Sequence, residues 1–196
     1  MASVVDICNS ALNMIGASNI LALTEDSKAA RICNQRYTFV RDSVFRSHPW
    51  NCLIRRVSLT PDSETPEFDF SHQYTLPTDP FCLRVLRLED ADTVHKIEGR
   101  KILTNTNPIK MMYVARIEDP NEYDQLLIES ISAKLASDIS YALVNSTSLT
   151  QQMQNMYEQK VKEARFVDAT EGTPELVTNN NSTVFVEGDQ FIASRF

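Results

Sequence analysis

Glycine is scarce in this sequence, and its scarcity excludes one class of chemistry. The 196 residues contain four glycines, and no two of them form a G-x-G or P-loop pattern: Gly16, Gly99, Gly172 and Gly188. Phosphate-binding loops need closely spaced glycines, because the backbone must approach the anion. The sequence therefore argues against nucleotide hydrolysis.

Metal and thiol sites also lack their usual spacing. The three histidines fall in different predicted elements: His48, His72 and His95. The four cysteines form no C-x-x-C pair and sit in apolar patterns that predict buried, reduced thiols: Cys8, Cys33, Cys52 and Cys82. We therefore expect no metal and no cofactor. No G-x-S-x-G elbow occurs, so nucleophilic catalysis is not indicated either.

Long apolar runs are missing as well. No stretch approaches the roughly 18 residues that a membrane-spanning helix needs, and the N-terminus shows no basic and apolar leader pattern. We expect a cytoplasmic product with no membrane contact.

A hydrophobic content of 42% with 23% charged residues is ordinary for a globular protein. A chain of this length has room for one core, or for one core with a smaller insert.

The net charge is −7, but it is unevenly distributed. Residues 27–60 hold seven Lys or Arg and one acid, whereas residues 118–171 hold ten acids and four bases. An acidic total argues against wrapping nucleic acid, because that mode of binding depends on neutralising phosphates. Such a surface instead suits DNA that slides past without sticking.

Helical periodicity appears in both halves of the sequence. Apolar residues spaced by three and four predict helices over about 3–15, 25–48, 120–144 and 148–169. Thr24 is the expected N-cap of the second helix, and Asp119 with Pro120 is expected to open the third. Between residues 51 and 117 the period changes to two and prolines recur, which predicts an antiparallel insert of four to six strands.

These patterns predict an α+β protein that is mainly α. We expect a four-helix bundle formed by residues 1–50 and 118–170, a β subdomain at 51–117, and an extended C-terminal arm at 171–196.

The arm is rich in large apolar side chains for a stretch that cannot fold alone. Ordering each residue costs about 1–2 kcal/mol, whereas only eight of the 26 residues can return about 1.5–3 kcal/mol each on burial. We therefore expect the arm to bind a partner, with anchors at Val184, Phe185, Val186, Phe191, Ile192 and Phe196. Thr183 to Val186 suits addition to a sheet edge. The alternative is an unstructured polar tail.

The second predicted helix carries a basic face. Its four arginines recur at intervals of five: Arg31, Arg36, Arg41 and Arg46. One interpretation is a subunit interface with an acidic neighbour. The other is a solvated face whose ion pairs contribute little.

Several phrases occur in the order seen in one family. They are Cys8-Asn9-Ser10-Ala11-Leu12, Leu23-Thr24-Glu25-Asp26-Ser27, His48-Pro49-Trp50-Asn51, Tyr74-Thr75-Leu76-Pro77, Ile97-Glu98-Gly99-Arg100 and Tyr113-Val114-Ala115-Arg116. Together they span about residues 4–170. In these phrases the chain resembles the head-to-tail connector proteins of short-tailed bacteriophages, called tail tubular protein A or gatekeeper adaptors.

The resemblance implies a virion structural protein at the head-tail junction and no enzymatic activity. It implies a dodecameric ring that binds the portal protein, extends the DNA channel and receives the distal tail tubular (nozzle) protein. Genome DNA would pass without specific binding, and the C-terminal arm would dock on the portal. Two alternatives stay open: a tail-associated cell-wall hydrolase that uses a carboxylate pair, and a non-viral helical adaptor that binds through its arm.

Overall fold

The first helix begins where Ser3 caps it. In the computed structural model, which describes residues 2–171, 177–179 and 182–184, α1 spans Val4–Met14. The Ser3 hydroxyl accepts a hydrogen bond from the Asp6 N–H, and the Asp6 carboxylate accepts one from the Ser3 N–H. This capping box satisfies backbone donors that the first turn leaves open. Gly16 follows the helix at a φ of +70°, a conformation that glycine adopts at little cost.

The second helix, α2, spans Lys28–Ser47 and begins later than the periodicity predicted. Its N-cap is Ser27 and not Thr24, because the Ser27 hydroxyl accepts the Ala30 N–H at 3.1 Å. Glu25 belongs to the preceding loop, where its carboxylate accepts a backbone N–H. The loop between α1 and α2 therefore includes three residues that we expected to be helical.

Two further helices follow the β insert. α3 spans Gln125–Val144 and α4 spans Thr147–Thr170. α3 starts later than the predicted residue 120, because residues 120–122 form a separate 3-10 turn. Asp124 caps α3 by accepting two backbone N–H groups of the first turn. The chain reverses at Asn145, which adopts a left-handed φ of +54°.

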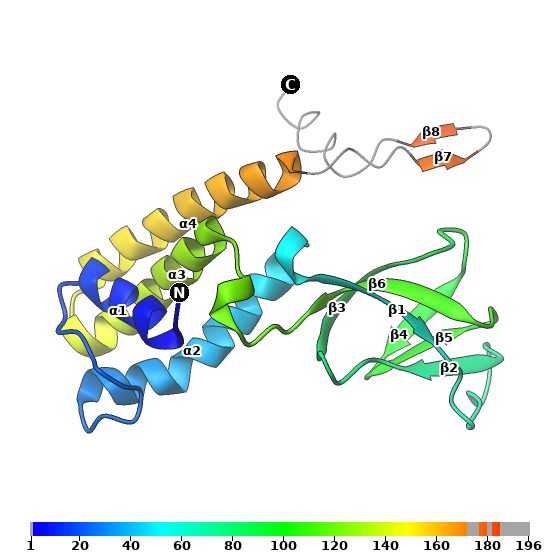
Figure 1. Ribbon diagram of the computed structural model, residues 1–196, viewed down its shortest axis with the longest axis horizontal. Helices are drawn as coiled ribbons and strands as arrows, with labels where there is room; N and C mark the ends of the chain where they lie inside the picture. Colours follow the sequence, from blue (N-terminus) through cyan, green and yellow to red (C-terminus); the bar gives the residue numbers. More distant parts are fainter. Residues whose placement is uncertain (1, 172–176, 180–181, 185–196) are drawn as a thin grey trace.

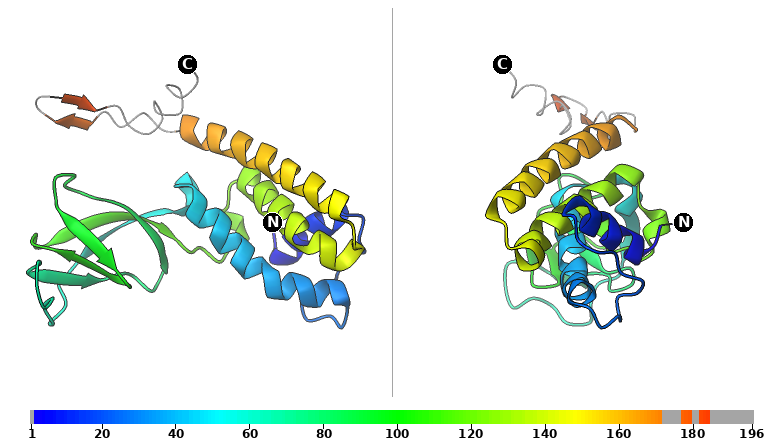
Figure 2. Two further views of the ribbon diagram at one scale, coloured as in Figure 1. Left: turned by 180° about the vertical axis from the view of Figure 1, so that it is seen from behind. Right: turned by 90° about the vertical axis from the view of Figure 1, so that its left-hand side faces the viewer.

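Helix α3 is the centre of the helical part. The other three helices all pack against it, whereas α1 and α2 touch each other little. Its largest fully buried side chains recur at intervals of four residues: Leu127, Ile131, Leu135 and Ile139. Figure 2 shows α1, α2 and α4 disposed around α3 from two further directions.

The predicted fold class, a mainly α four-helix bundle, is wrong. The described residues form an α+β fold with four helices and two three-stranded antiparallel sheets, apart from the short C-terminal hairpin. Helices of a four-helix bundle share one central core, but here α3 itself occupies the centre. α1 has only 11 residues, too few to run the length of the 20-residue α3. A helical part with an inserted β subdomain is compatible with the structure.

The insert forms six strands in two sheets. Their bounds are β1 Ile54–Leu59, β2 His72–Thr75, β3 Cys82–Leu88, β4 His95–Glu98, β5 Lys101–Thr104 and β6 Ile109–Ala115. One sheet has the order β1-β6-β3 and the other β2-β5-β4, with every pair antiparallel. We call this part the β lobe. A short 3-10 turn, Asn51–Leu53, leads into it from α2.

One hydrophobic core connects the helices with the β lobe. Buried side chains of the sheets, such as Tyr74, Ile102 and Tyr113, belong to the same cluster as Phe45 of α2 and Ile131 of α3. The molecule is elongated, with the helices at one end and the β lobe at the other (Figure 1). The shared core joins these two ends into one body.

Of the predicted arm, residues 171–196, the structure describes Glu171 and two short strands. β7, Val177–Asn179, pairs antiparallel with β8, Ser182–Val184. The arm is therefore not extended throughout, as we expected, because these six residues form a hairpin with each other.

Candidate functional site

The root of the arm is held by one buried acid. Asp168 lies in the last turn of α4 and is only 8% exposed. Its carboxylate accepts the Asn51 N–H at 2.9 Å and lies 3.1 Å from Nε2 of His48. Its backbone carbonyl accepts the Asn51 side-chain amide at 2.6 Å. Three residues before the arm begins, α4 is thus bound to the segment that leads into the β lobe. We call this set of contacts the Asp168 joint.

Neighbouring contacts strengthen the Asp168 joint. Trp50 is fully buried and donates its indole N–H to the Val44 carbonyl at 3.0 Å. The His48 ring packs edge-on against Trp50, with centroids 4.8 Å apart. Arg165 of α4 donates to the Ser47 hydroxyl at 3.1 Å. The sequence His48-Pro49-Trp50-Asn51, one of the phrases behind the family resemblance, is therefore the connection between α2, α4 and the β lobe.

The structure places Arg41 inside the subunit. It is 5% exposed, and its guanidinium pairs with Asp42 at 2.8 Å. It also lies over the rings of Tyr37 and Phe45. Asp42 pairs in turn with Arg116, next to the β lobe, at 2.7 Å. Arg41 thus belongs to a network within the chain, although the sequence suggested a residue facing another subunit.

The other three arginines of the basic face have separate partners. Arg31 pairs with the exposed Asp26, and Arg36 pairs with Asp138 of α3. Arg46 donates to the Leu83 carbonyl of β3. The four arginines therefore do not form one free basic surface. A role for Arg31, Arg36 and Arg46 between subunits stays a prediction.

The predicted arm anchors fall largely outside the described residues. Val184 is the last residue of β8. The others lie beyond the described part of the chain: Phe185, Val186, Phe191, Ile192 and Phe196. Their contact with a portal stays a prediction.

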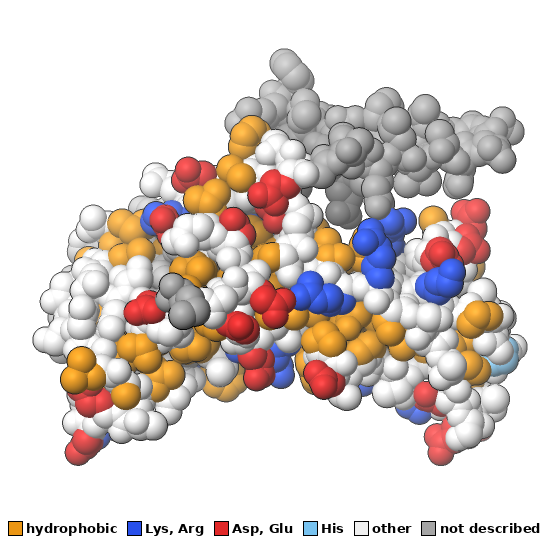
Figure 3. Space-filling view, viewed as in Figure 1, with side chains coloured by type: hydrophobic (Ala, Val, Ile, Leu, Met, Phe, Trp, Pro, Cys, Tyr) orange, Lys and Arg blue, Asp and Glu red, His pale blue; other side chains and the backbone are white. Residues whose placement is uncertain are grey.

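Exposed apolar side chains lie close to the arm root. Phe166 and Val167, near the end of α4, are 72% and 36% exposed. Figure 3 shows hydrophobic side chains at this end of α4. Others lie in the β lobe at Phe68, Val94 and Ile97.

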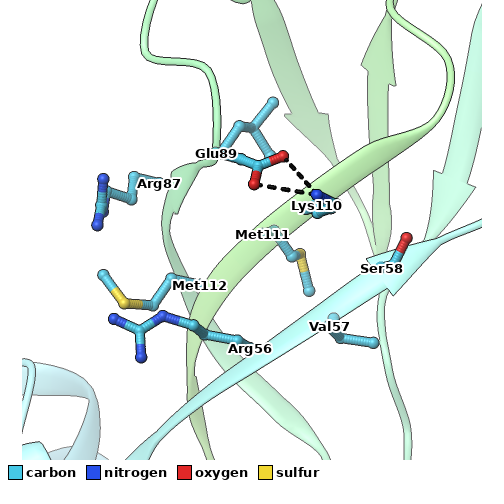
Figure 4. A pocket seen from close by; sticks show the side chains of 9 residues that line it. Arg56, Val57, Ser58, Arg87, Glu89, Lys110, Met111 and Met112 are labelled. Carbon is cyan, nitrogen blue, oxygen red and sulfur yellow. Dashed lines mark hydrogen bonds and ion pairs between the residues drawn. The ribbon is translucent and has the colours of Figure 1, made fainter.

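An open groove of about 350 Å³ lies along the β1-β6-β3 sheet. Figure 4 shows its basic and methionine side chains: Arg56, Arg87, Lys110, Met111 and Met112. Lys110 of β6 pairs at 3.1 Å with Glu89, the residue that follows β3. We call this surface the sheet groove. A second hollow, of about 320 Å³, lies beside the loop at residues 66–70.

The described cysteines are placed as buried or half-buried thiols. Burial raises the pKa of Cys52 and of Cys82. A hydrogen bond with Cys33, together with burial, raises the pKa of Cys8. A raised pKa keeps a thiol protonated and therefore weakly nucleophilic near neutral pH. Within residues 2–171, 177–179 and 182–184, no group of three or more His, Cys, Asp or Glu is arranged to hold a metal ion.

Neither Asp168 nor the sheet groove was predicted from the sequence. Asp168 follows Val161 and Ala164 at helical spacing, so it occupies a buried position of α4, and that spacing could have revealed it. The groove residues lie on three strands that are far apart in the sequence. Only the strand order brings Arg56, Arg87 and Met112 together.

Comparisons with known proteins add no family to this description. The chain matches no protein-family model, and no curated protein is significantly similar to it. In the part of the chain that the structure describes, none of the helices has the length and apolar character needed to cross a membrane.

Proposed function

We propose that this protein is a virion structural protein that joins the portal of a short-tailed bacteriophage to its tail. In this proposal it forms a ring of twelvefold symmetry, as the resemblance implies, with the C-terminal arm bound to the portal. The distal tail tubular (nozzle) protein binds the opposite side. The ring works through its interfaces and not through catalysis.

The Asp168 joint is the observation that carries the proposal. It holds the arm root against the beginning of the β lobe, with Asp168 8% exposed and three hydrogen-bonded contacts. An arm that transmits force between two large assemblies needs a rigid attachment at its base. The exposed Phe166 and Val167 extend the available contact surface at the same place.

Charge supports the passage of DNA through such a ring. Twelve copies at −7 each bring 12 × −7 = −84 charges around the channel. A negative electrostatic field around the channel repels the phosphates of DNA and keeps DNA from binding the channel wall.

Coupled folding and binding of the arm would delay the ordering of the arm until the portal is present.

The test mixes the purified full chain with the candidate portal ring and measures mass by light scattering. A second sample uses a chain that ends at Glu171. We expect a ring-sized gain in mass with the full chain and none with the shortened chain, because the arm supplies the portal contact. Replacing Phe185, Phe191 and Phe196 together by alanine should reduce the gain in the same way.

Other results of the light-scattering test would count against different parts of the proposal. If the full chain adds no mass, the connector proposal is wrong. If the shortened chain binds equally well, the ring proposal survives but the arm does not carry the contact. The sequence offers the acidic pairs Glu67 with Asp69 and Glu89 with Asp90 for the hydrolase alternative. Cleavage of peptidoglycan by the full chain, lost when Glu67 or Glu89 is replaced by glutamine, would favour that alternative.

A further inference from the structure

Strand β4 is an outer strand of its sheet and has one free edge. β5 pairs with it on one side, and it stands last in the strand order β2-β5-β4. All four of its residues, His95–Glu98, are exposed. In the described part of the chain, no backbone hydrogen bond joins them to a segment other than β5. Figure 1 shows β4 beside β5 in the β lobe. We call the side of β4 that faces away from β5 the β4 edge.

The turn after β4 fixes which backbone groups point outward at the β4 edge. Glu98 pairs with Lys101 across the two-residue loop Gly99-Arg100, whose glycine has a φ of +58°. In such a turn the carbonyl before the loop accepts the N–H after it, so Glu98 and Lys101 form a hydrogen-bonded pair. Hydrogen-bonded pairs alternate with pairs that exchange no bond. The next pair, Ile97 with Ile102, therefore leaves the N–H and C=O of Ile97 directed away from β5.

The side chains around Ile97 carry opposite charges. Lys96 and Glu98 lie on one face of the strand, because alternate residues share a face, and both line the hollow beside the loop at residues 66–70. Lys96 lies over the Phe70 ring, 5.9 Å from the ring centroid. Neither Lys96 nor Glu98 has an ion pair with another described residue. Ile97, between them, is 49% exposed.

An antiparallel second copy that sets Ile97 opposite the partner's Ile97 satisfies both features of the β4 edge. The outward N–H and C=O of each Ile97 then bond to those of the other copy, as in a hydrogen-bonded antiparallel pair. The same register sets Lys96 directly opposite the partner's Glu98, and Glu98 opposite the partner's Lys96. Two opposite-charge pairs across neighbouring strands stabilise this arrangement.

Other registers at the β4 edge bring like charges together. If His95 pairs with the partner's Ile97, Lys96 stands opposite the partner's Lys96, and like charges directly opposite each other are destabilising. A parallel copy in register also places lysine beside lysine and glutamate beside glutamate. Charges on an edge strand usually prevent pairing with another copy. The order Lys96-Ile97-Glu98 instead selects one antiparallel copy.

We infer that the free protein forms a two-fold dimer in which the β4 edges of two copies pair antiparallel through Ile97, with Lys96 of each copy bound to the partner's Glu98. The two β2-β5-β4 sheets then join into one continuous sheet. Strands of this length bury little surface, so the dimer is weak and forms at high protein concentration.

The dimer goes beyond the connector role and does not depend on it. A two-fold contact joins only two copies, whereas a closed ring needs head-to-tail contacts. If both proposals hold, the dimer is a form of the free protein that dissociates before the ring closes. The experiments below contain no portal, so their outcome is separate from that of the portal-binding test.

Sedimentation velocity of the full chain, over a wide range of protein concentrations, measures the dissociation constant of the dimer. We expect Lys96→Glu to raise this constant about tenfold, because it replaces two attractive pairs by two repulsive ones. Glu98→Lys should have the same effect for the same reason. A chain with both substitutions again places opposite charges across the axis and should dimerise like the unmodified chain.

An equimolar mixture of the two single variants is the sharper test. Lys96→Glu leaves acids at both positions and Glu98→Lys leaves bases at both, so each variant pairs with the other and not with itself. We expect the mixture to recover the association that each variant loses alone. The matched controls, Lys162→Glu and Glu163→Lys, make the same charge changes at neighbouring exposed positions of α4. They should leave association unchanged, alone and mixed.

Hydrogen exchange measured by NMR locates the contact. Exchange of the Ile97 N–H should slow as the protein concentration rises, because the dimer protects it. Ile97→Pro removes this outward N–H and no bond to β5, so it should abolish the dimer while the circular dichroism spectrum stays unchanged.

Three results would overturn the inference. The first is a full chain that stays monomeric at every concentration. The second is a mixture of the two single variants that fails to recover association. The third is a dimer in which exchange of the Ile97 N–H is unchanged, since its contact would then lie elsewhere.

Discussion

Asp168 is the residue on which the attachment of the arm depends. Its carboxylate accepts a backbone N–H of Asn51 and contacts His48, and it is almost fully shielded from water. A buried donor that loses its acceptor keeps the cost of desolvation without the compensating bond. At the scale of single residues, therefore, this acid contributes far more to stability than an exposed one.

We expect Asp168→Ala to lower the free energy of unfolding by about 2–4 kcal/mol, because it leaves the Asn51 N–H without its acceptor. Urea denaturation followed by circular dichroism measures this change. Asp168→Asn should cost less, since it keeps an oxygen that can accept. The control, Asp26→Ala, removes a carboxylate that is 95% exposed and should cost less than about 0.5 kcal/mol. Equal losses for Asp168→Ala and Asp26→Ala would show that the joint does not contribute as described.

At the scale of secondary-structure elements, the other helices pack around helix α3. The helices α1, α2 and α4 all pack against it, and leucines and isoleucines along its length are fully buried. Truncating a side chain in the middle of α3 therefore affects the contacts of several elements together. The short α1 and the capped ends of α2 and α4 are arranged around this helix.

We expect Leu135→Ala to lower the free energy of unfolding by about 2–5 kcal/mol, because it leaves a cavity at the centre of the helical part. Thermal and urea unfolding both report the change. Leu21→Ala is the matched control, since Leu21 is 93% exposed and should change stability by less than about 0.5 kcal/mol. A loss at Leu135 no larger than at Leu21 would contradict the central role of α3.

The charge asymmetry matters at the scale of the whole molecule. Basic residues concentrate on α2, and acids concentrate on the chain from residue 118 onward. In a ring built from head-to-tail contacts, unlike faces of neighbouring subunits meet. Arg31 is the best probe of this arrangement, because the partner of its ion pair in the described part of the chain is the exposed Asp26. Arg41 is unsuitable, since it is buried and its replacement would disturb the fold.

We expect Arg31→Glu to weaken ring formation on the portal about fivefold, because it places an acid where an acidic neighbour would dock. The measurement is the number of copies bound per portal, by light scattering over a range of protein concentrations. Lys162→Glu makes the same charge change on the acidic side of the molecule and should have little effect. Equal assembly by the two variants would refute the charge-paired interface.

The sequence by itself determined where the helices and the β insert occur along the chain. Apolar spacing of three and four located the helices around residues 3–15 and 148–169, and alternation located strands between 51 and 117. These signals are local, because each helix or strand shows its buried face in its own periodicity. Cap positions were less certain: Thr24 and Ser27 are both plausible N-caps, and only the surrounding loop selects Ser27.

The tertiary structure alone decided how the elements combine. It made α3 a central helix instead of one member of a bundle, and it buried Arg41 against aromatic rings. It also brought Asp168 to Asn51 across 117 residues. Arg56 and Arg87 lie on either side of Met112 only because β6 lies between β1 and β3. Such contacts depend on strand order and packing between distant segments, which local periodicity does not encode.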